Sequence, residues 1–171
     1  MKRIFLAAFS GILLFTACGL AASVSPLESQ VRHRLVMLSR YGVFDDIAFQ
    51  VSGRTVTLTG QVAEPVLKDD AARTLTKIEG VEKVVNNIEV LPLSPFDDRL
   101  RLAVYRAVYS DPNFSTRYGL SSVPSVHIIV KNGNVELEGV VANQFDRTLA
   151  GMRANGVSGA FSVINDLRIE N

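Results

Sequence analysis

Val, Leu, Gly and Val occupy every second position from Val135 to Val141, and the positions between them are mostly polar. The same order of residues occurs 79 positions earlier, from Val56 to Val62. A period of two is typical of a strand with one buried face. A second alternating run precedes each stretch, and a short segment with turn-forming glycine separates the two runs. Each half of the chain is therefore predicted to contain a β-hairpin.

The repeat continues beyond the hairpin, because apolar residues, a glycine and an asparagine recur at the same offset to the end of the chain. The matched pairs include Ile78 and Val157, Gly80 and Gly159, Val84 and Val163, Asn86 and Asn165, and Ile88 and Leu167. A full-length internal duplication indicates two copies of one structural unit. The chain is therefore expected to form two small modules.

Four glycines belong to this repeated pattern and are expected to have structural roles. Gly60 and Gly139 stand inside the second strand of each hairpin. Glycine at such a place usually marks a bulge or a close approach by another segment. Gly80 and Gly159 follow the second helical pattern of each half, where they are expected to end the helix and release the chain into the last strand.

Each half opens with a strong helix start and has a second helix after its hairpin. Ser25-Pro26 and Ser94-Pro95 each provide a side-chain cap and a proline at the first helical position, followed by an acid. Apolar residues at helical spacing then predict an amphipathic helix. For the last helix of the chain, the expected apolar face consists of Phe145, Leu149 and Met152.

The predicted elements of each half follow the order helix, strand, strand, helix, strand. Their apolar faces are best buried by two helices on one face of a three-stranded mixed sheet, with a parallel crossover. The predicted fold is α+β, with two tandem αββαβ modules at residues 25–91 and 96–171. A proline-rich linker at 92–95 joins them, and the second module has an insertion at about 110–122 between its first helix and first strand.

Residues 1–23 have the plan of a secretory signal peptide, with a basic stub, an apolar run and then small residues. The apolar run is too short to span a bilayer comfortably. The only cysteine of the chain, Cys18, follows it in a context similar to a bacterial lipobox. Two fates remain open. Acylation of Cys18 gives a lipoprotein anchored to the outer membrane, whereas cleavage after Ala21 or Ser23 gives a soluble periplasmic protein.

The repeated motifs resemble those of the BON domain, which occurs singly or in tandem in periplasmic and outer-membrane-associated bacterial proteins. They read Val56-x-Leu58-x-Gly60-x-Val62 and Gly80-Val81-x-x-Val84-x-Asn86-x-Ile88, with their partners Val135-x-Leu137-x-Gly139-x-Val141 and Gly159-x-x-x-Val163-x-Asn165-x-Leu167. The resemblance covers essentially everything after residue 25. It implies the same helix–hairpin–helix–strand fold and a non-enzymatic role in phospholipid binding and envelope integrity.

Charge and composition give no support for catalysis or nucleic-acid binding. Removal of Lys2 and Arg3 with the signal peptide changes the net charge from +1 to −1, so the mature chain has no basic excess for nucleic acid. His33 and His127 are expected to face solvent, and neither has a Cys or carboxylate at metal-ligand spacing. No catalytic residue, metal site or cofactor is predicted.

The candidate membrane contact lies on the first helix of the second module and the insertion behind it. Arginine and aromatic side chains suit a headgroup interface, because the cation meets phosphate and the ring sits at the polar boundary. The candidate residues are Arg99, Tyr105, Arg106, Tyr109, Phe114, Arg117 and Tyr118. The alternative is that the insertion folds back and its aromatic rings complete a small core.

Two classes of function remain open. In the first, the protein is a membrane-surface module that contacts anionic phospholipid and is tethered through Cys18. In the second, it is a periplasmic protein-interaction or cell-wall-associated adaptor that docks an envelope protein. The docking surface would then be a free strand edge or the open sheet face that carries Thr55, Thr57, Thr59 and Gln61.

Overall fold

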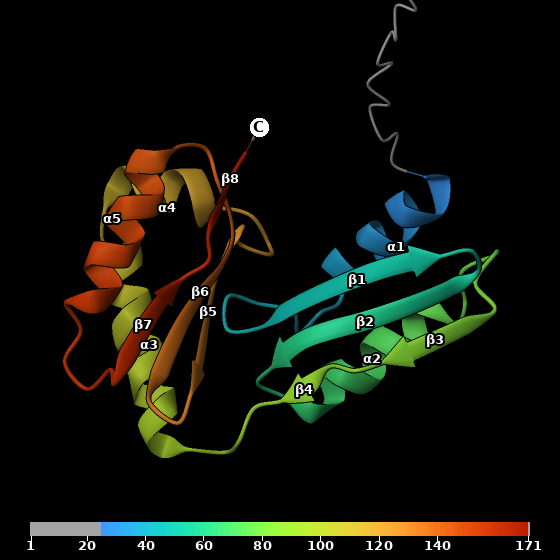
Figure 1. Cartoon of the computed structure of the whole chain (residues 1–171), viewed down its shortest axis with the longest axis horizontal. Helices are drawn as coiled ribbons and strands as arrows, with labels where there is room; N and C mark the ends of the chain where they lie inside the picture. Colours follow the sequence, from blue (N-terminus) through green and yellow to red (C-terminus); the bar gives the residue numbers. More distant parts are fainter. Residues whose placement is uncertain (1–24, 171) are drawn as a thin grey trace, which may run out of the picture.

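The computed structural model of the chain describes residues 25–170, which form two modules of the same design (Figure 1). The signal peptide expected over residues 1–23, with Cys18, lies outside the described residues. The first module contains α1 (Pro26–Val36), β1 (Asp46–Ser52), β2 (Thr55–Val62), α2 (Pro65–Leu75), β3 (Lys83–Asn86) and β4 (Glu89–Val90).

The second module repeats this order and adds one helix. Its elements are α3 (Pro95–Tyr109), α4 (Pro112–Tyr118), β5 (Val126–Lys131), β6 (Asn134–Val141), α5 (Gln144–Asn155), β7 (Ser162–Asn165) and β8 (Arg168–Ile169). Within residues 25–170, each helix is too short or too polar to cross a membrane.

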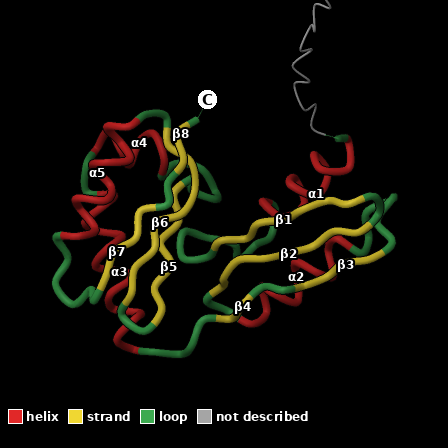
Figure 2. Tube along the Cα trace, in the orientation of Figure 1, coloured by secondary structure: helices red, strands yellow, loops and turns green. Residues whose placement is uncertain are grey.

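In both modules the second strand of the hairpin lies at the centre of the sheet. β2 pairs antiparallel with β1 and parallel with β3 and β4, and β6 pairs in the same way with β5, β7 and β8. The helices α1 and α2 cover one face of the first sheet, and α3 and α5 cover one face of the second (Figures 1 and 2). The predicted α+β fold of two αββαβ modules is confirmed.

The last strand of each module is interrupted, which the sequence pattern did not predict. The side-chain amide of Asn86 donates to the carbonyl of Lys68 on α2 (2.8 Å), and its oxygen accepts a hydrogen bond from the backbone N–H of Ile88 (3.3 Å). Asn165 makes the equivalent bonds in the second module. The resulting turn directs Ile88 and Leu167 into the two cores, where they are 1% and 2% exposed.

The strand glycines mark a close approach within each hairpin. Gly60 and Gly139 have φ angles of 108° and 118°, which L side chains rarely adopt. A Cβ atom at these positions would also overlap the backbone carbonyl of Asp46 on β1 or of Ser125, the residue before β5. Glycine therefore allows the two backbones of each hairpin to approach closely at this point.

The other two motif glycines do not end the second helices as expected. α2 ends at Leu75 and α5 ends at Asn155, several residues before Gly80 and Gly159. These glycines have φ angles of 94° and 99°. They allow the turn through which the chain enters β3 and β7.

The apolar face expected for α5 is wrong for two of its three residues, whereas Leu149 does pack against the core. Phe145 and Met152 are 72% and 60% exposed. A Cβ atom at Gly151 would lie 2.6 Å from Nδ2 of Asn165, so the helix runs very close to the last strand here. The buried side of α5 includes the small residues Ala150, Gly151 and Ala154. This close approach turns the larger apolar side chains outward.

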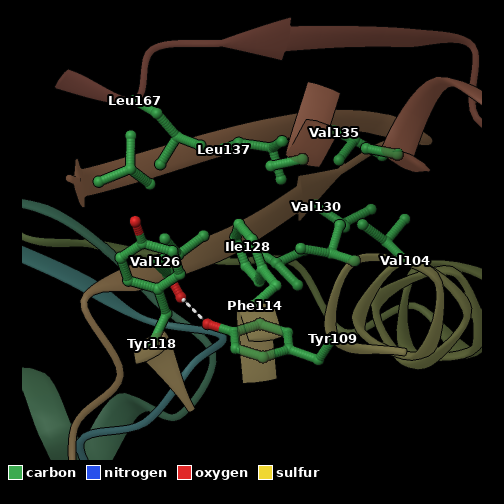
Figure 3. Packing of buried hydrophobic residues seen from close by; sticks show 14 of the residues in the cluster. Val104, Tyr109, Phe114, Tyr118, Val126, Ile128, Val130, Val135, Leu137 and Leu167 are labelled. Atoms are coloured by element: carbon green, nitrogen blue, oxygen red, sulfur yellow. Dashed lines mark hydrogen bonds between the residues drawn. The ribbon is translucent and has the colours of Figure 1, made fainter. Parts of the chain in front are cut away.

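The insertion of the second module folds into the short helix α4. The side chain of Asp111 caps its start by accepting hydrogen bonds from the backbone N–H groups of Asn113 and Phe114 (2.9 and 3.1 Å). The ring of Phe114 lies between those of Tyr109 and Tyr118 (Figure 3). The insertion thus completes the core below the sheet.

The loop between α1 and β1 joins the two modules. The carbonyl of Val43 accepts a hydrogen bond from the backbone N–H of Ile128 (2.7 Å) on β5, the edge strand of the second sheet. Val43 and Phe44 pack against the second core. His127 stacks on Tyr41 and is 7% exposed. The expectation that His127 faces solvent is therefore wrong, because the first module covers the outer side of β5 at this point.

Candidate membrane-contact site

Three of the seven predicted contact residues are buried. Tyr109, Phe114 and Tyr118 are 7%, 2% and 5% exposed. The hydroxyl group of Tyr109 donates a hydrogen bond to the carbonyl of Val126 (2.7 Å), as Figure 3 shows. The expectation that these three rings face a membrane is wrong, because α4 folds back against α3 and uses them to fill the core.

Tyr118 and Arg117 instead fix the start of α5. The hydroxyl group of Tyr118 donates to Oδ2 of Asp146 (2.6 Å) and accepts a hydrogen bond from the backbone N–H of Ala142 (2.8 Å). Arg117 forms an ion pair with the same carboxylate, and its side chain is 49% exposed. Burial, followed by the hydrogen bond with Asp146, raises the pKa of Tyr118, so the hydroxyl stays protonated as a donor. This network has a structural role.

Tyr105 lies at the contact between the modules. Its ring packs edge-on against Phe44 and stacks on Tyr109, with centroid distances of 6.1 and 4.8 Å. It keeps a partly exposed surface. Its principal contacts are therefore aromatic ones within the protein.

Arg99 and Arg106 are the two predicted residues that remain free for a ligand. Both are exposed on α3, and Leu102, which is 45% exposed, lies between them. The spacing of three and four residues places all three side chains on one helix face, opposite the buried Leu100 and Val104. Neither arginine forms an ion pair with another residue of the described part of the chain.

α5 packs beside α3 on the same side of the sheet and adds apolar surface to this layer (Figure 1). Phe145 and Met152, seven residues apart, lie on the face of α5 opposite its buried side. The outward surface of these two helices, here called the helix-layer face, is defined by Arg99, Leu102, Arg106, Phe145 and Met152. It combines two unpaired cations with three exposed apolar side chains.

Sequence reasoning missed the exposure of Phe145 and Met152, although the internal repeat contained the signal. The buried residues of α2 are Leu67, Ala71 and Leu75. At the repeat offset they match Asp146, Ala150 and Ala154, which are the positions that α5 buries. Aligning the two helices would have placed Phe145 and Met152 outside.

A group of carboxylates lies on the outer face of the second sheet. Oxygens of Glu136, Glu138 and Asp166 lie within 4.8 Å of one another. Burial, followed by the charges of Asp46, Glu136 and Asp166, raises the pKa of Glu138 to about 7. This crowding keeps the local potential negative, but partly exposed acidic groups of this kind are common without a metal.

The residues considered for protein docking lie on β2 of the first sheet. Thr59 is exposed there, whereas Thr55, Thr57 and Gln61 are half-buried. Gln61 also lines a cavity of about 270 Å³ with Ile129 of the second module. Part of this sheet face therefore belongs to the contact between the modules.

The comparison with protein families agrees with the repeated architecture. The model of the BON domain matches residues 23–92 and again residues 97–171. No curated protein matches the chain significantly. Two solved structures of CdsD, a structural protein of the type III secretion system of Chlamydia trachomatis, are similar at 12% identity. The CdsD C-terminal domain has a TM-score of 0.30, with 85% of this chain and 98% of that chain covered. The other structure has a TM-score of 0.27, with coverages of 82% and 92%.

The match to the BON domain indicates the general class of function. A BON domain indicates a periplasmic, envelope-associated module of the phospholipid-binding type, and the family is generally non-enzymatic. The two matches lie one in each half and together span most of the chain. This protein therefore belongs to the BON domain family and carries two copies of the domain.

Proposed function

We propose that the second module binds the surface of an anionic phospholipid membrane through its helix-layer face and thereby supports the integrity of the bacterial envelope. The observation that carries this proposal is the pairing of two free cations, Arg99 and Arg106, with the exposed side chains of Phe145 and Met152 on one surface. Large exposed apolar residues beside charged groups are typical of interaction surfaces.

The chemistry of this surface suits a lipid headgroup region. Each guanidinium can bind a phosphate oxygen, and its attraction to an anionic surface contributes about 1 kcal/mol. The ring of Phe145 and the thioether chain of Met152 can enter the boundary between headgroups and acyl chains. The net charge of the mature protein does not oppose this contact, because salt screens charges that are more than about 10 Å away.

The helix of the first module that corresponds to α5, which is α2, presents a different outward face, and this difference supports a contact through the second module. At the repeat offset, Phe145 corresponds to Val66 and Met152 corresponds to Arg73, which forms an ion pair with Asp70. The outward face of α2 is therefore smaller in apolar area and carries acidic charge. We expect it to contribute little to membrane binding.

The proposal includes a lipid anchor on Cys18, which lies outside the described residues. A surface that relies on two cations and a few apolar side chains binds weakly, so stable association needs a second attachment. Acylation at Cys18 would provide it. The substitution Cys18→Ser is expected to move the processed protein from the washed membrane fraction to the soluble fraction. Retention of the processed variant in washed membranes would contradict the anchor.

Vesicle flotation of residues 25–171, which contain both cores, tests the membrane contact without the anchor. We expect binding to phosphatidylglycerol vesicles that weakens as salt is added. The double substitution Arg99→Gln/Arg106→Gln removes about 2 kcal/mol of attraction, so the partition coefficient is expected to fall about thirty-fold.

The matched control is Arg34→Gln/Lys77→Gln, which removes the same charge from exposed positions of the first module. It is expected to retain nearly all binding. Equal losses in the two double variants would show that only net charge matters and would contradict a site on α3. Absence of flotation by the unaltered protein would favour the role of a protein adaptor.

A further inference from the structure

A cleft between the two modules joins an apolar arm to a polar arm. The apolar arm, about 540 Å³ in volume, lies between the end of α1 and the segment that precedes β5. The polar arm, about 470 Å³, lies between β1 and the outer face of β6. Four residues line both arms, namely Arg32, Asp46, Gly139 and Arg168. The charged side chains are thus placed at the junction of the arms.

The junction carries two cations that come from different modules. Arg32 lies on α1 and Arg168 on β8, and neither forms an ion pair within residues 25–170. The guanidinium of Arg32 lies over the ring of Phe49, 5.3 Å from its centroid, which holds it in place. Two guanidinium groups that line one junction and form no ion pair are suited to one phosphate group.

Two carboxylates accompany these cations. Asp46 lines the junction, and Glu138 lines the polar arm beside it. A headgroup that is only anionic would be repelled by these carboxylates, and a ligand that is only cationic would be repelled by the arginines. A headgroup with one phosphate and one ammonium group can satisfy both pairs.

The apolar arm provides a place for a hydrocarbon chain. Val36 and Met37 at the end of α1 are 41% and 69% exposed, and both line this arm. Val123, Pro124 and Val140 line it from the second module. A cavity of this volume between two domains, with an apolar wall and a few charged groups, has the character of a small-molecule site.

We propose that this cleft binds a single-chain zwitterionic amphiphile of the lysophosphatidylethanolamine class. Arg32 and Arg168 bind its phosphate, Asp46 and Glu138 accept hydrogen bonds from its ammonium group, and the acyl chain lies along Val36 and Met37. This site is separate from the helix-layer face. It would allow the protein to hold one lipid molecule between its modules in addition to contacting a membrane surface.

Calorimetric titration of residues 25–171 with lysophosphatidylethanolamine below its micelle concentration tests the proposal. We expect saturable binding of one molecule per chain. Lysophosphatidate with the same acyl chain lacks the ammonium group and is expected to bind at least about ten-fold more weakly. Glu138→Gln is expected to reduce this preference, because it removes one negative charge that attracts the ammonium and repels the second lipid.

Arg168→Gln is expected to weaken binding about ten-fold. Arg168 is exposed on β8 and outside the core, so this variant keeps the fold. Arg34→Gln, at an exposed position of α1 that lines neither arm of the cleft, is the matched control and is expected to bind as the unaltered protein does. Absence of saturable binding, equal affinity for both lipids, or equal affinity of the Arg168 and Arg34 variants would overturn the proposal. These results are independent of vesicle flotation, which reports on the other face.

Discussion

Tyr118 and Arg117 are adjacent in sequence and contact the same carboxylate, yet they contribute differently to stability. The hydroxyl of Tyr118 is buried and links Asp146 to the backbone of Ala142. Its loss leaves the N–H of Ala142 and an oxygen of Asp146 without this partner. We expect Tyr118→Phe to lower the free energy of unfolding by about 1–3 kcal/mol, measured by urea denaturation.

Arg117→Gln is the matched control for this network. Because its side chain is half exposed, its ion pair with Asp146 is screened by water and contributes about 0–1 kcal/mol. Equal stability of the Tyr118→Phe variant and the unaltered protein would mean that the hydroxyl is replaceable by solvent. In that case the hydroxyl group of the buried Tyr118 would contribute nothing to stability, and only the packing of its ring would matter.

Residue types alone could not decide which aromatic side chains of the insertion are exposed. Arginine and tyrosine are suited both to a lipid surface and to a small core with polar partners, so both alternatives were consistent with the sequence. The deciding features were local ones. Asp111-Pro112 is a helix start, and it places Phe114 and Tyr118 four residues apart on one face of α4. The exposed pair Arg99 and Arg106 was identifiable from helical spacing on α3.

At the scale of elements, the sequence predicted which helices and strands exist better than which sides they bury. The spacing of Phe145, Leu149 and Met152 is helical, but the neighbouring small residues satisfy the same period. The choice between these two faces depends on how closely α5 approaches Asn165 of β7, which is a tertiary contact. The periodicity of the sequence predicts that a helix forms. The space available beside the sheet determines how the helix is rotated about its axis, and therefore which side it buries.

The outer face of β6 makes stability depend on pH. Burial and three nearby carboxylates raise the pKa of Glu138 from 4.5 to about 7 in the folded protein. The folded state therefore holds this proton more tightly than the unfolded state does. The resulting stabilisation is fully present below pH 4.5 and is lost as the pH rises to about 7. We expect urea denaturation to show a decline over this range.

Glu138→Gln removes the titrating group but keeps a side chain of similar size. The free energy of unfolding of this variant is expected to depend less on pH. The difference in this free energy between the variant and the unaltered protein is expected to favour the variant more at pH 8 than at pH 5. Glu170→Gln, at an exposed position near the chain end, is the control and should leave the decline in place. An unchanged pH profile for the Glu138 variant would assign the effect to other groups.

At the scale of the whole molecule, the duplication predicted two modules but not the contact between them. One sign of that contact was present in β5, where Ile128, Ile129 and Val130 interrupt the alternation of buried and exposed residues. Ile129 is 2% exposed because the outer side of β5 is also covered. The loop that provides Val43 and Phe44 to this contact has no regular pattern, and its docking follows only from the assembled structure.

We propose that the helix-layer face of the second module, and not the matching face of the first, enters a membrane surface. The chain has a single cysteine, Cys18, so a protein of residues 25–171 accepts one engineered label at a time. Spin labels at Met152→Cys on α5 and at Arg73→Cys on α2 compare equivalent positions of the two modules. Their accessibility to oxygen, which concentrates in lipid, and to a water-soluble nickel complex reports where each label lies.

With phosphatidylglycerol vesicles present, the label at position 152 is expected to gain oxygen accessibility and to lose nickel accessibility. The label at position 73 is expected to remain in water. A label at position 152 that stays in water while the protein is bound to vesicles, or a label at position 73 that enters the lipid equally, would contradict the account.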